Sequence, residues 1–311
     1  FSNDRFSYFK TKIMKIVKDI FLGKKILIYG LGKSGISTFK FLKKKADVYL
    51  FDDDQKVNQK IISINQLIKI EFDRIIISPG IDISNCKLSK FLNKNLDKIY
   101  TDLDVFYSFY KNTSIAITGT NGKSTTAKIL FDILNDQKRD VRLIGNIGNP
   151  ALSEKKISKK TFFVIEVSSY QLEYSKIFSA KYAVILNISV DHIERHKNLT
   201  NYVNAKFKLL DSQNNKSFAF VKKNDRLINQ KIRKNKFKPK IYKVDTLNMN
   251  KLSNQLNNKY FISDGNKENL SFVLKIASKL KLNKIKLFKT LNKFKGLKYR
   301  QQIIFDNKNL T

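Results

Sequence analysis

The chain has few of the residues that fasten a protein covalently, hold a metal or cross a membrane. Its 311 residues include one cysteine, Cys86, and two histidines, His192 and His196. A single cysteine excludes an internal disulfide and a cysteine-based metal site. No apolar run approaches the roughly 20 residues that a membrane-spanning helix requires. We therefore expect a soluble, cytoplasmic protein without a membrane partner.

Acidic residues are scarce beside basic ones, with 26 against 61 and a formal net charge of +35. Such an excess suggests nucleic acid, because clustered lysine and arginine release phosphate counterions. Only eight of the basic residues are arginine, which specific base readers favour, and the lysines are spread along the whole chain. We expect solvated lysine-rich faces and no nucleic-acid partner, with a basic nucleic-acid-binding module as a distant alternative.

Short apolar runs of β type alternate with helical patterns, and hydrophobic residues make up 42% of the chain. This alternation predicts an α/β fold with mainly parallel sheets, in a chain long enough for two domains. We expect strands over residues 24–30, 47–51, 74–80, 113–118, 162–169 and 182–189. We expect helices over 34–45 and 124–135, and β-type runs with loops over 211–260.

The stretch "GLGKSG", residues 30–35, follows an expected strand and opens an expected helix. Its glycines permit a tight turn and the close approach of a pyrophosphate to backbone N–H groups. Asp52 ends the next strand about 20 residues later, where an acid commonly meets a ribose or base. Taken alone, this pattern favours an NAD-dependent oxidoreductase, although several classes of nucleotide-binding protein share it and a plain tight turn would also produce it.

A second glycine loop, "GTNGKSTT" at residues 119–126, also lies between a strand and a helix. It differs from the common phosphate loop, because Ile117 stands where that pattern requires its first glycine. Lys123 would neutralise the β and γ phosphates of ATP, and Ser124 would bind Mg²⁺. The residues expected to cradle ATP are Gly119, Thr120, Asn121, Gly122, Lys123, Ser124 and Thr125. Two phosphate sites in succession suggest an ATP-using enzyme whose other substrate is a nucleotide conjugate.

Together these residues resemble the Mur ligases, the ATP-dependent amino-acid ligases of peptidoglycan precursor synthesis. The folylpolyglutamate synthetases have a similar loop but lack the nucleotide-sugar-binding first domain. The match is closest to the ligases that add D-glutamate to UDP-N-acetylmuramoyl-L-alanine, with another Mur-type ligase as the alternative. It rests on "GLGKSG" (30–35), "SPGI" (78–81), "GNIGNPAL" (145–152), "IEVSSYQLE" (165–173), "ILNISVDHIERH" (185–196) and "GLKYR" (296–300).

The resemblance implies a Rossmann-like UDP-sugar-binding domain over 14–108 and a P-loop-type central ATPase domain over 109–296. It also implies a third domain that begins at 297–311, so this chain alone is expected to bind the sugar nucleotide but to turn over poorly. Residues 1–13 precede the first methionine, Met14, and we expect them to be a non-native or disordered extension. The expected substrates are ATP, UDP-N-acetylmuramoyl-L-alanine and D-glutamate, and the expected state is a monomer.

Three residues are expected to organise two Mg²⁺ ions together with Ser124. Glu166 ends an apolar run at the carboxyl edge of a parallel sheet, and the matching family residue is a magnesium ligand. The resemblance makes His192 a ligand of the second ion, whereas His196 has no assigned role. Lys206 has apolar neighbours one helical turn away, and burial lowers the pKa of a lysine and leaves its amine nucleophilic. The family carbamylates the matching lysine with CO₂.

The resemblance assigns further residues to the two nucleotides. Those matched to the UDP substrate are Gly32, Lys33, Ser34, Asp52, Ser78, Pro79, Gly80, Asn146 and Ser168. Asn266 and Asn269 match the adenine-side motif, in which Gly265 replaces the usual histidine. Arg300 is retained for the ATP phosphates, although Lys298 and Tyr299 depart from the family pattern. The "HIERH" stretch is not a zinc-protease motif, because Ile193 stands where that motif needs glutamate.

Overall fold

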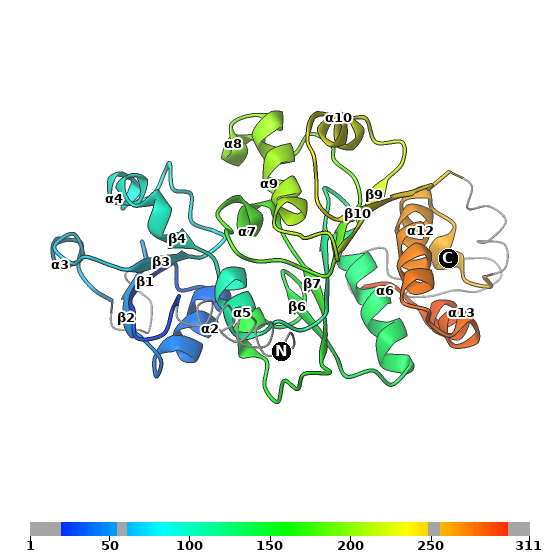
Figure 1. Cartoon of the computed structure of the whole chain (residues 1–311), viewed down its shortest axis with the longest axis horizontal. Helices are drawn as coiled ribbons and strands as arrows, with labels where there is room; N and C mark the ends of the chain where they lie inside the picture. Colours follow the sequence, from blue (N-terminus) through cyan, green and yellow to red (C-terminus); the bar gives the residue numbers. More distant parts are fainter. Residues whose placement is uncertain (1–19, 55–60, 248–255, 298–311) are drawn as a thin grey trace, which may run out of the picture. The chain divides into compact units, whose positions relative to one another are not determined.

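The computed structural model describes residues 20–54, 61–247 and 256–297 (Figure 1). The chain divides into two compact units. Unit 1 comprises residues 1–111, 150–155 and 170–179, and unit 2 comprises 112–149, 156–169 and 180–311. The expected extension at 1–13, Arg300 and nearly all of the expected start of a third domain lie outside the described residues.

Unit 1 contains a four-stranded, fully parallel sheet with the strand order β2-β1-β3-β4. Its strands are β1 (Lys25–Tyr29), β2 (Asp47–Phe51), β3 (Arg74–Ile77) and β4 (Ile99–Tyr100). Its helical segments are α2 (Lys33–Leu42), α3 (Ile64–Leu67), α4 (Ser89–Lys94), η1 (Leu96–Lys98), α5 (Asp102–Phe109) and η2 (Ala151–Ser153). β1 lies between β2 and β3, so the strand order reverses at β1, and ligands bind at such points in open α/β sheets.

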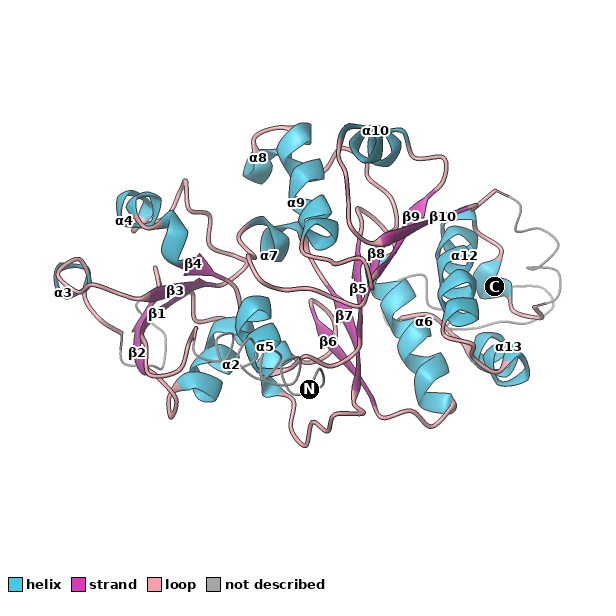
Figure 2. Ribbon diagram, viewed as in Figure 1, coloured by secondary structure: helices cyan, strands magenta, loops and turns pink. Residues whose placement is uncertain are grey.

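Unit 2 contains a six-stranded, fully parallel sheet with the order β10-β9-β8-β5-β7-β6 (Figure 2). Its strands are β5 (Ser114–Thr118), β6 (Val141–Gly145), β7 (Phe162–Glu166), β8 (Tyr182–Ile185), β9 (Phe218–Lys222) and β10 (Lys240–Val244). After β5 the chain forms β6 at one edge of the sheet and returns to form β7 between β6 and β5. It then crosses to the other side of β5, where it forms β8. The strand order of this sheet therefore reverses at β5.

Helices lie on both faces of the second sheet (Figure 2). They are α6 (Lys123–Asp136), α8 (Ile193–His196), α9 (Leu199–Asp211), α10 (Arg226–Lys234), η3 (Lys259–Phe261), α12 (Asp264–Lys279) and α13 (Lys284–Lys293). α6 packs against β5, β6, β7, α12 and α13, whereas α9 packs against β8, α8 and α10. α7 (Ser169–Glu173) begins at the last residue of a unit 2 segment and continues in unit 1.

Each sheet has its own apolar core. The unit 1 core includes Leu27, Tyr29 and Ile75, and the unit 2 core includes Ile117, Leu130 and Val164, all of them buried. The central strands β5 and β7 are buried along their whole length, as expected for parallel strands that are covered on both faces. Burial on both faces explains why these strands appear in the sequence as continuous apolar runs.

The α/β fold with parallel sheets is confirmed, but several boundaries differ from the expectation. Three strands end three or four residues early, at Ile77, Glu166 and Ile185, because the chain leaves the sheet there and forms the loops at its carboxyl edge. The segment 211–260 also contains α10, which the sequence pattern missed. Among the described residues, none of the helices is both long and apolar enough to cross a bilayer.

The two helices that follow the glycine loops have glycine N-caps. Asn198, Asp225 and Asn283 cap α9, α10 and α13 by accepting a hydrogen bond from a backbone N–H of the first turn. By contrast, Gly32 is the N-cap of α2 and Gly122 that of α6, with no side-chain cap and no acidic residue in the first turn. Neither helix start is capped by the side chain of its own N-cap residue, which is an arrangement that suits an anion.

Candidate functional site

The second glycine loop follows β5, the strand at which the order of the unit 2 sheet reverses. Gly122 adopts the left-handed conformation, with φ of 81°. A Cβ at this position would lie 2.0 Å from Oδ1 of Asn269 on α12. Both the backbone conformation and the close approach of α12 therefore require glycine. Asn269 Oδ1 also accepts a hydrogen bond of 3.3 Å from the Thr126 hydroxyl, so one asparagine joins α12 to the start of α6.

Lys123 lies at the first position of α6 and folds back over its own loop. Its ammonium group donates to the carbonyl oxygens of Thr120, at 2.7 Å, and Gly119, at 3.0 Å. Ser124 and Thr125 follow in the first turn and are buried. The loop thus holds a cation, two hydroxyls and an uncapped helix start within four consecutive residues. That set matches the needs of a polyphosphate with a hard cation.

Asn187, which comes just after β8, fixes the loop through main chain and side chain. Its carbonyl oxygen accepts the Thr120 N–H at 3.0 Å, and its side-chain Oδ1 accepts the Asn121 N–H at 2.9 Å. Its Nδ2 donates to Glu268 Oε1 at 2.8 Å, and Glu268 forms an ion pair with Lys222 through its other oxygen. These contacts involve residues that no sequence pattern had singled out.

A cavity of about 620 Å³ opens beside the loop. Six of the predicted ATP-binding residues line it, namely Asn121, Gly122, Ser124, Thr125, Asn266 and Asn269. The remaining lining residues are Asn187, Ile188, Ser189, Lys222, Asp225, Tyr260, Gly265 and Glu268. A Cβ added at Gly265 would meet nothing within 4 Å, so the glycine leaves open space where the family pattern has histidine.

Tyr260 lines this cavity, and burial raises the pKa of its hydroxyl. Asn266 donates from Nδ2 to the carbonyl oxygen of Tyr260 at 2.8 Å, which fixes the start of α12 against η3. Asn266 and Asn269, in the first two turns of α12, are both buried. Buried amides with fixed partners can present defined donors and acceptors to a ligand.

Glu166 ends β7 and is 1% exposed. Its Oε1 accepts a hydrogen bond of 2.9 Å from Asn146 Nδ2, while Oε2 has no hydrogen-bond partner among the described residues. A buried carboxylate oxygen without a donor is costly unless a cation compensates it. The predicted metal ligand and the predicted substrate residue Asn146 are therefore neighbours.

Lys206 on α9 is 1% exposed, as its apolar neighbours predict. Its Nζ donates to the Gly119 carbonyl oxygen at 2.8 Å, the oxygen that also accepts from Lys123, and lies 4.4 Å from the centre of the Tyr202 ring. The pKa of Lys206 is lowered to about 7, mainly by burial and also by the positive charge of Lys123, while Asp191 opposes the shift. A substantial fraction of this amine is neutral at physiological pH.

The two histidines lie at opposite ends of α8. His192 is the N-cap, with φ of 53°, and its side chain is 42% exposed near the carboxylates of Asp191 and Glu194. His196 is buried and its Nε2 lies 3.0 Å from the Ser169 hydroxyl. Burial lowers the pKa of His196 to about 4, with a contribution from the neighbouring charge of Arg195. His196 is thus a neutral, internal residue that packs against Tyr202.

Within the described residues, no three histidine, cysteine, aspartate or glutamate side chains gather closely enough to hold a metal by themselves. Glu166 offers a single carboxylate, and Lys206 and Lys123 meet at one carbonyl oxygen. Such a sparse donor set fits Mg²⁺, which is commonly bound by one or two protein groups together with substrate phosphates and water.

The first glycine loop, in unit 1, follows β1. A Cβ at Gly35 would lie 1.9 Å from the Gly30 carbonyl oxygen, so only glycine lets α2 approach the strand. Ser78, just after β3, donates its hydroxyl to the same carbonyl at 2.6 Å. Pro79 and Gly80 follow in a turn closed by the Ile81 N–H and the Ser78 carbonyl. The predicted residues Gly32, Lys33 and Ser34 form the uncapped start of α2.

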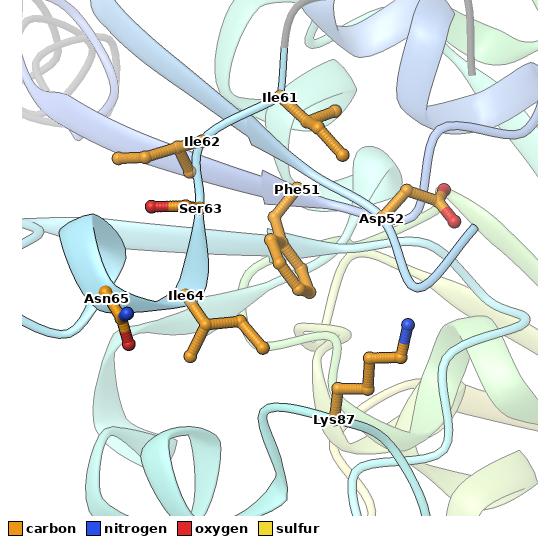
Figure 3. Close-up of a pocket in the computed structure, with 8 residues that line it drawn as sticks. All are labelled: Phe51, Asp52, Ile61, Ile62, Ser63, Ile64, Asn65 and Lys87. Atoms are coloured by element: carbon orange, nitrogen blue, oxygen red, sulfur yellow. The ribbon is translucent and has the colours of Figure 1, made fainter. Parts of the chain in front are cut away.

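Asp52 binds the first loop from the end of β2. One oxygen accepts the Leu31 N–H at 2.5 Å and the other accepts the Asp54 N–H at 2.9 Å. Asp52 also lines a cavity of about 460 Å³ with Phe51, Lys87 and residues 61–65. Figure 3 shows the apolar side chains of Phe51 and Ile64 in this cavity, with Asp52 and Lys87 beside them. An apolar wall with a few polar groups is typical of a small-molecule site.

The structure groups the predicted residues by unit. Gly32, Lys33, Ser34, Asp52, Ser78, Pro79 and Gly80 lie around the first loop, whereas Asn146 and Ser168 belong to unit 2. Asn187, Lys222, Asp225, Tyr260 and Glu268 line the unit 2 cavity and were not predicted. Asn187 follows a buried parallel strand, as Glu166 does, so the strand-end rule that identified Glu166 was also the available signal for Asn187.

Comparison with known proteins places this geometry in a family. Residues 117–293 match the Mur ligase middle domain, and the chain belongs to the Mur ligase family. It is 32% identical to the UDP-N-acetylmuramoylalanine–D-glutamate ligase of Rickettsia felis, over 92% of this chain and 69% of that protein. It is 34% identical to the protein of the same name from Rickettsia prowazekii, over 93% of this chain and 70% of that protein.

The fold is also found among solved structures. The chain is similar to UDP-N-acetylmuramate:L-alanyl-gamma-D-glutamyl-meso-diaminopimelate ligase from Neisseria meningitides, with a TM-score of 0.58 and 14% sequence identity. The alignment covers 88% of this chain and 99% of that one. At this identity the likeness concerns the fold alone, and it confirms the expected class of parallel α/β architecture.

Proposed function

We propose that this chain holds the two nucleotides of an ATP-dependent ligase that joins D-glutamate to UDP-N-acetylmuramoyl-L-alanine. The observation that carries the proposal is the 620 Å³ cavity beside the uncapped start of α6, with Lys123 over the loop and the buried amides of α12 among its lining. The names of the Rickettsia relatives support the choice of amino acid and sugar nucleotide. Another Mur-type amino-acid ligase is the alternative.

In this reaction the L-alanine carboxylate of the sugar nucleotide attacks the γ-phosphate of ATP, which gives an acyl phosphate and ADP. The D-glutamate amine then displaces phosphate and forms the amide. The chain contributes position and charge: the N–H groups at the start of α6 and the ammonium of Lys123 would hold the β and γ phosphates. Gly119, Thr120, Asn121, Gly122, Ser124 and Thr125 complete the expected cradle, with Asn266 and Asn269 on the adenine side.

We infer that two Mg²⁺ ions accompany ATP. Ser124 and Glu166 would hold one of them, and His192 and Lys206 the other. When bound, such ions would neutralise charge that develops on the phosphate oxygens. The unpartnered Oε2 of buried Glu166 supports a cation there. Replacing Glu166 by glutamine should raise the Mg²⁺ concentration needed for nucleotide binding, which titration calorimetry measures.

We also infer that CO₂ carbamylates Lys206. A buried amine with a pKa near 7 is partly neutral at physiological pH, and a neutral amine is the form that attacks CO₂. A carbamate resonance in the ¹³C spectrum of protein equilibrated with labelled bicarbonate, absent from Lys206→Ala, is the expected result. Full activity of the Lys206→Ala enzyme without bicarbonate dependence would remove the idea.

We infer that unit 1 binds the UDP part of the sugar nucleotide. The cavity beside Asp52 has an apolar wall suited to a base, and the uncapped start of α2 suits a diphosphate. Gly32, Lys33, Ser34, Ser78, Pro79 and Gly80 would contact the nucleotide, and Asn146 and Ser168 the muramoyl-alanine part. The same loop geometry supports the alternative of a dinucleotide-binding oxidoreductase, so the ligand has to be tested.

Binding measurements separate these functions. The chain should bind ATP with Mg²⁺ and, independently, UDP-N-acetylmuramoyl-L-alanine, and calorimetry should find one site for each. Quenching of NADH fluorescence by the chain, without sugar-nucleotide binding, would favour an oxidoreductase. Any phosphate release should require both UDP-N-acetylmuramoyl-L-alanine and D-glutamate. Stimulation by a different amino acid would move the chain to another branch of the family.

A further inference from the structure

We propose that Glu268 is a positioning residue for ATP, which sets the phosphate loop through the side-chain amide of Asn187 and is itself held by Lys222. The proposal rests on the proposed function, because it assumes that the unit 2 cavity takes the triphosphate. Glu268 lies on α12 and reaches the loop only through Asn187.

The three side chains form one continuous series of polar contacts. Lys222, at the end of β9, pairs with one oxygen of Glu268. The other oxygen accepts from Asn187 Nδ2 at 2.8 Å, and Asn187 Oδ1 accepts the Asn121 N–H at 2.9 Å. Segments that are far apart in the sequence therefore meet at one backbone N–H of the glycine loop.

Glu268 provides the shorter of two contacts that set which way the amide of Asn187 faces, since Nδ2 also donates to the Asn121 carbonyl oxygen at 3.4 Å. In the observed orientation a carboxylate faces the amide NH₂, and the amide oxygen faces the N–H of Asn121. A flipped amide would set two acceptors against each other at Glu268 and two donors against each other at Asn121. The side chains of Glu268 and Lys222 are only 16% and 24% exposed, so water competes weakly for these contacts.

The contact with Asn187 affects which N–H groups of the glycine loop can face a phosphate. The Asn121 N–H is occupied by Asn187, so the phosphate-facing donors are those of the residues that open α6. Without Glu268 the Nδ2 of Asn187 keeps only its longer contact with the Asn121 carbonyl oxygen, at 3.4 Å. The acceptor for the Asn121 N–H is then held less firmly, and the segment from Thr120 to Asn121 becomes less ordered. The loop must then be ordered by the nucleotide, which weakens binding.

A simple charge effect makes the opposite prediction. Glu268 puts a negative charge at a cavity meant for polyphosphate, so if it acted only by charge, both Glu268→Ala and Glu268→Gln would bind ATP more tightly. If it acts by position, Glu268→Ala binds ATP more weakly by about tenfold, the scale of one lost hydrogen bond to a charged group. Glu268→Gln keeps an acceptor for Asn187 Nδ2 and should stay within about threefold of the unchanged protein.

The test measures the dissociation constant of ATP with Mg²⁺ by calorimetry for these variants and for Asn187→Ala. Because Glu268 acts through Asn187, adding Glu268→Ala to Asn187→Ala should produce no further loss. Additive losses would mean that Glu268 contacts the nucleotide itself, and tighter binding in Glu268→Ala would mean that charge alone matters. Either result overturns the proposal.

Asp264→Ala is the matched control. Asp264 lies in the first turn of the same helix, its side chain is fully exposed, and it is not among the residues that line the cavity. Its removal should leave ATP affinity unchanged. The affinity for UDP-N-acetylmuramoyl-L-alanine should also stay unchanged in every variant. If the unchanged protein bound no ATP, the proposed function would fail; if it bound ATP and Glu268→Ala bound it equally well, this inference alone would fail.

Discussion

The two glycine loops share one architecture and differ in charge. Each follows the strand at which its sheet reverses order, and each opens a helix whose start has no side-chain cap. The first loop is fixed by the carboxylate of Asp52, which accepts the Leu31 N–H. The second is fixed by the neutral amide of Asn187 and has Lys123 folded over it.

The difference in charge shows how the same strand–glycine loop–helix arrangement can suit different anions. A carboxylate beside the first loop adds negative charge, which suits a ligand that presents hydroxyl and ring N–H groups as well as a diphosphate. A lysine and two hydroxyls at the second loop add positive charge and metal-binding oxygen, which suits a triphosphate with Mg²⁺. Changes at one loop should therefore affect one nucleotide and spare the other.

Lys123→Ala should give the largest effect. Loss of the cation over the loop is expected to lower ATP turnover or affinity by about 100-fold or more, since charge at transferring phosphates is a major catalytic factor. Calorimetry with ATP and with UDP-N-acetylmuramoyl-L-alanine should find only the first affinity changed. Lys128→Ala, on the same helix but paired with Asp132, is the control and should bind both normally. Equal loss of both affinities would contradict the separation of the two loops.

Gly122→Ala should weaken ATP binding by about tenfold or more. Alanine in the left-handed conformation costs about 1–2 kcal/mol, and its Cβ would also meet Asn269. Gly265→Ala is the matched change, because a Cβ there meets nothing within 4 Å. Titration of both variants with ATP is the measurement, and a similar loss in the two would show that space and backbone conformation do not explain the glycine.

Asp52→Asn should weaken the sugar nucleotide about fivefold, because the amide can accept only one of the two N–H groups that Asp52 now binds. ATP affinity should not change. The neighbouring Asp53→Asn keeps an oxygen for the Tyr29 hydroxyl and serves as the control. The comparison of the loops would fail if Asp52→Asn altered ATP binding and left the sugar nucleotide unaffected.

Lys206 should make folding stability depend on pH. Its pKa is about 7 in the fold, below the ordinary 10.5, so between these values the unfolded chain binds a proton that the folded chain lacks. Unfolding free energy should therefore rise with pH over this range, by at most about 1.4 kcal/mol per unit, and the gain disappears below the folded pKa. Urea unfolding of the unchanged protein and of Lys206→Met, in bicarbonate-free buffer, measures the unfolding free energy of each at several pH values. If the amine stays charged in the folded protein, the difference between the two free energies should not change with pH, which would contradict this prediction.

Patterns confined to one stretch of sequence predicted most of the fold. Buried parallel strands gave continuous apolar runs, and the apolar neighbours of Lys206 correctly predicted its burial. α10 was missed because it is short and mostly charged or polar, with Ile228 as its only buried residue, so few apolar residues marked it as a helix. Its available signal was Asp225, which caps the helix by accepting the Ile228 N–H.

The contacts around the second loop were harder to predict. Lys222, Asn187 and Glu268 come from three separate segments, and each is an ordinary polar residue with no distinctive spacing. Their common place at the carboxyl edge of one sheet emerges only when the strand order is known. The occupied N–H of Asn121 likewise depends on tertiary contact, so the loop pattern alone overstated the number of amides that face a phosphate.

The chain order of unit 1 has a consequence for protein synthesis. Asp104 on α5 accepts hydrogen bonds from the Ser175 hydroxyl and from the N–H groups of Lys176, Ile177 and Phe178. Unit 1 therefore obtains these partners only after β5, β6 and β7 of unit 2 have left the ribosome. A protein cut after Lys111 would lack them, so an isolated amino-terminal fragment cannot complete this set of hydrogen bonds.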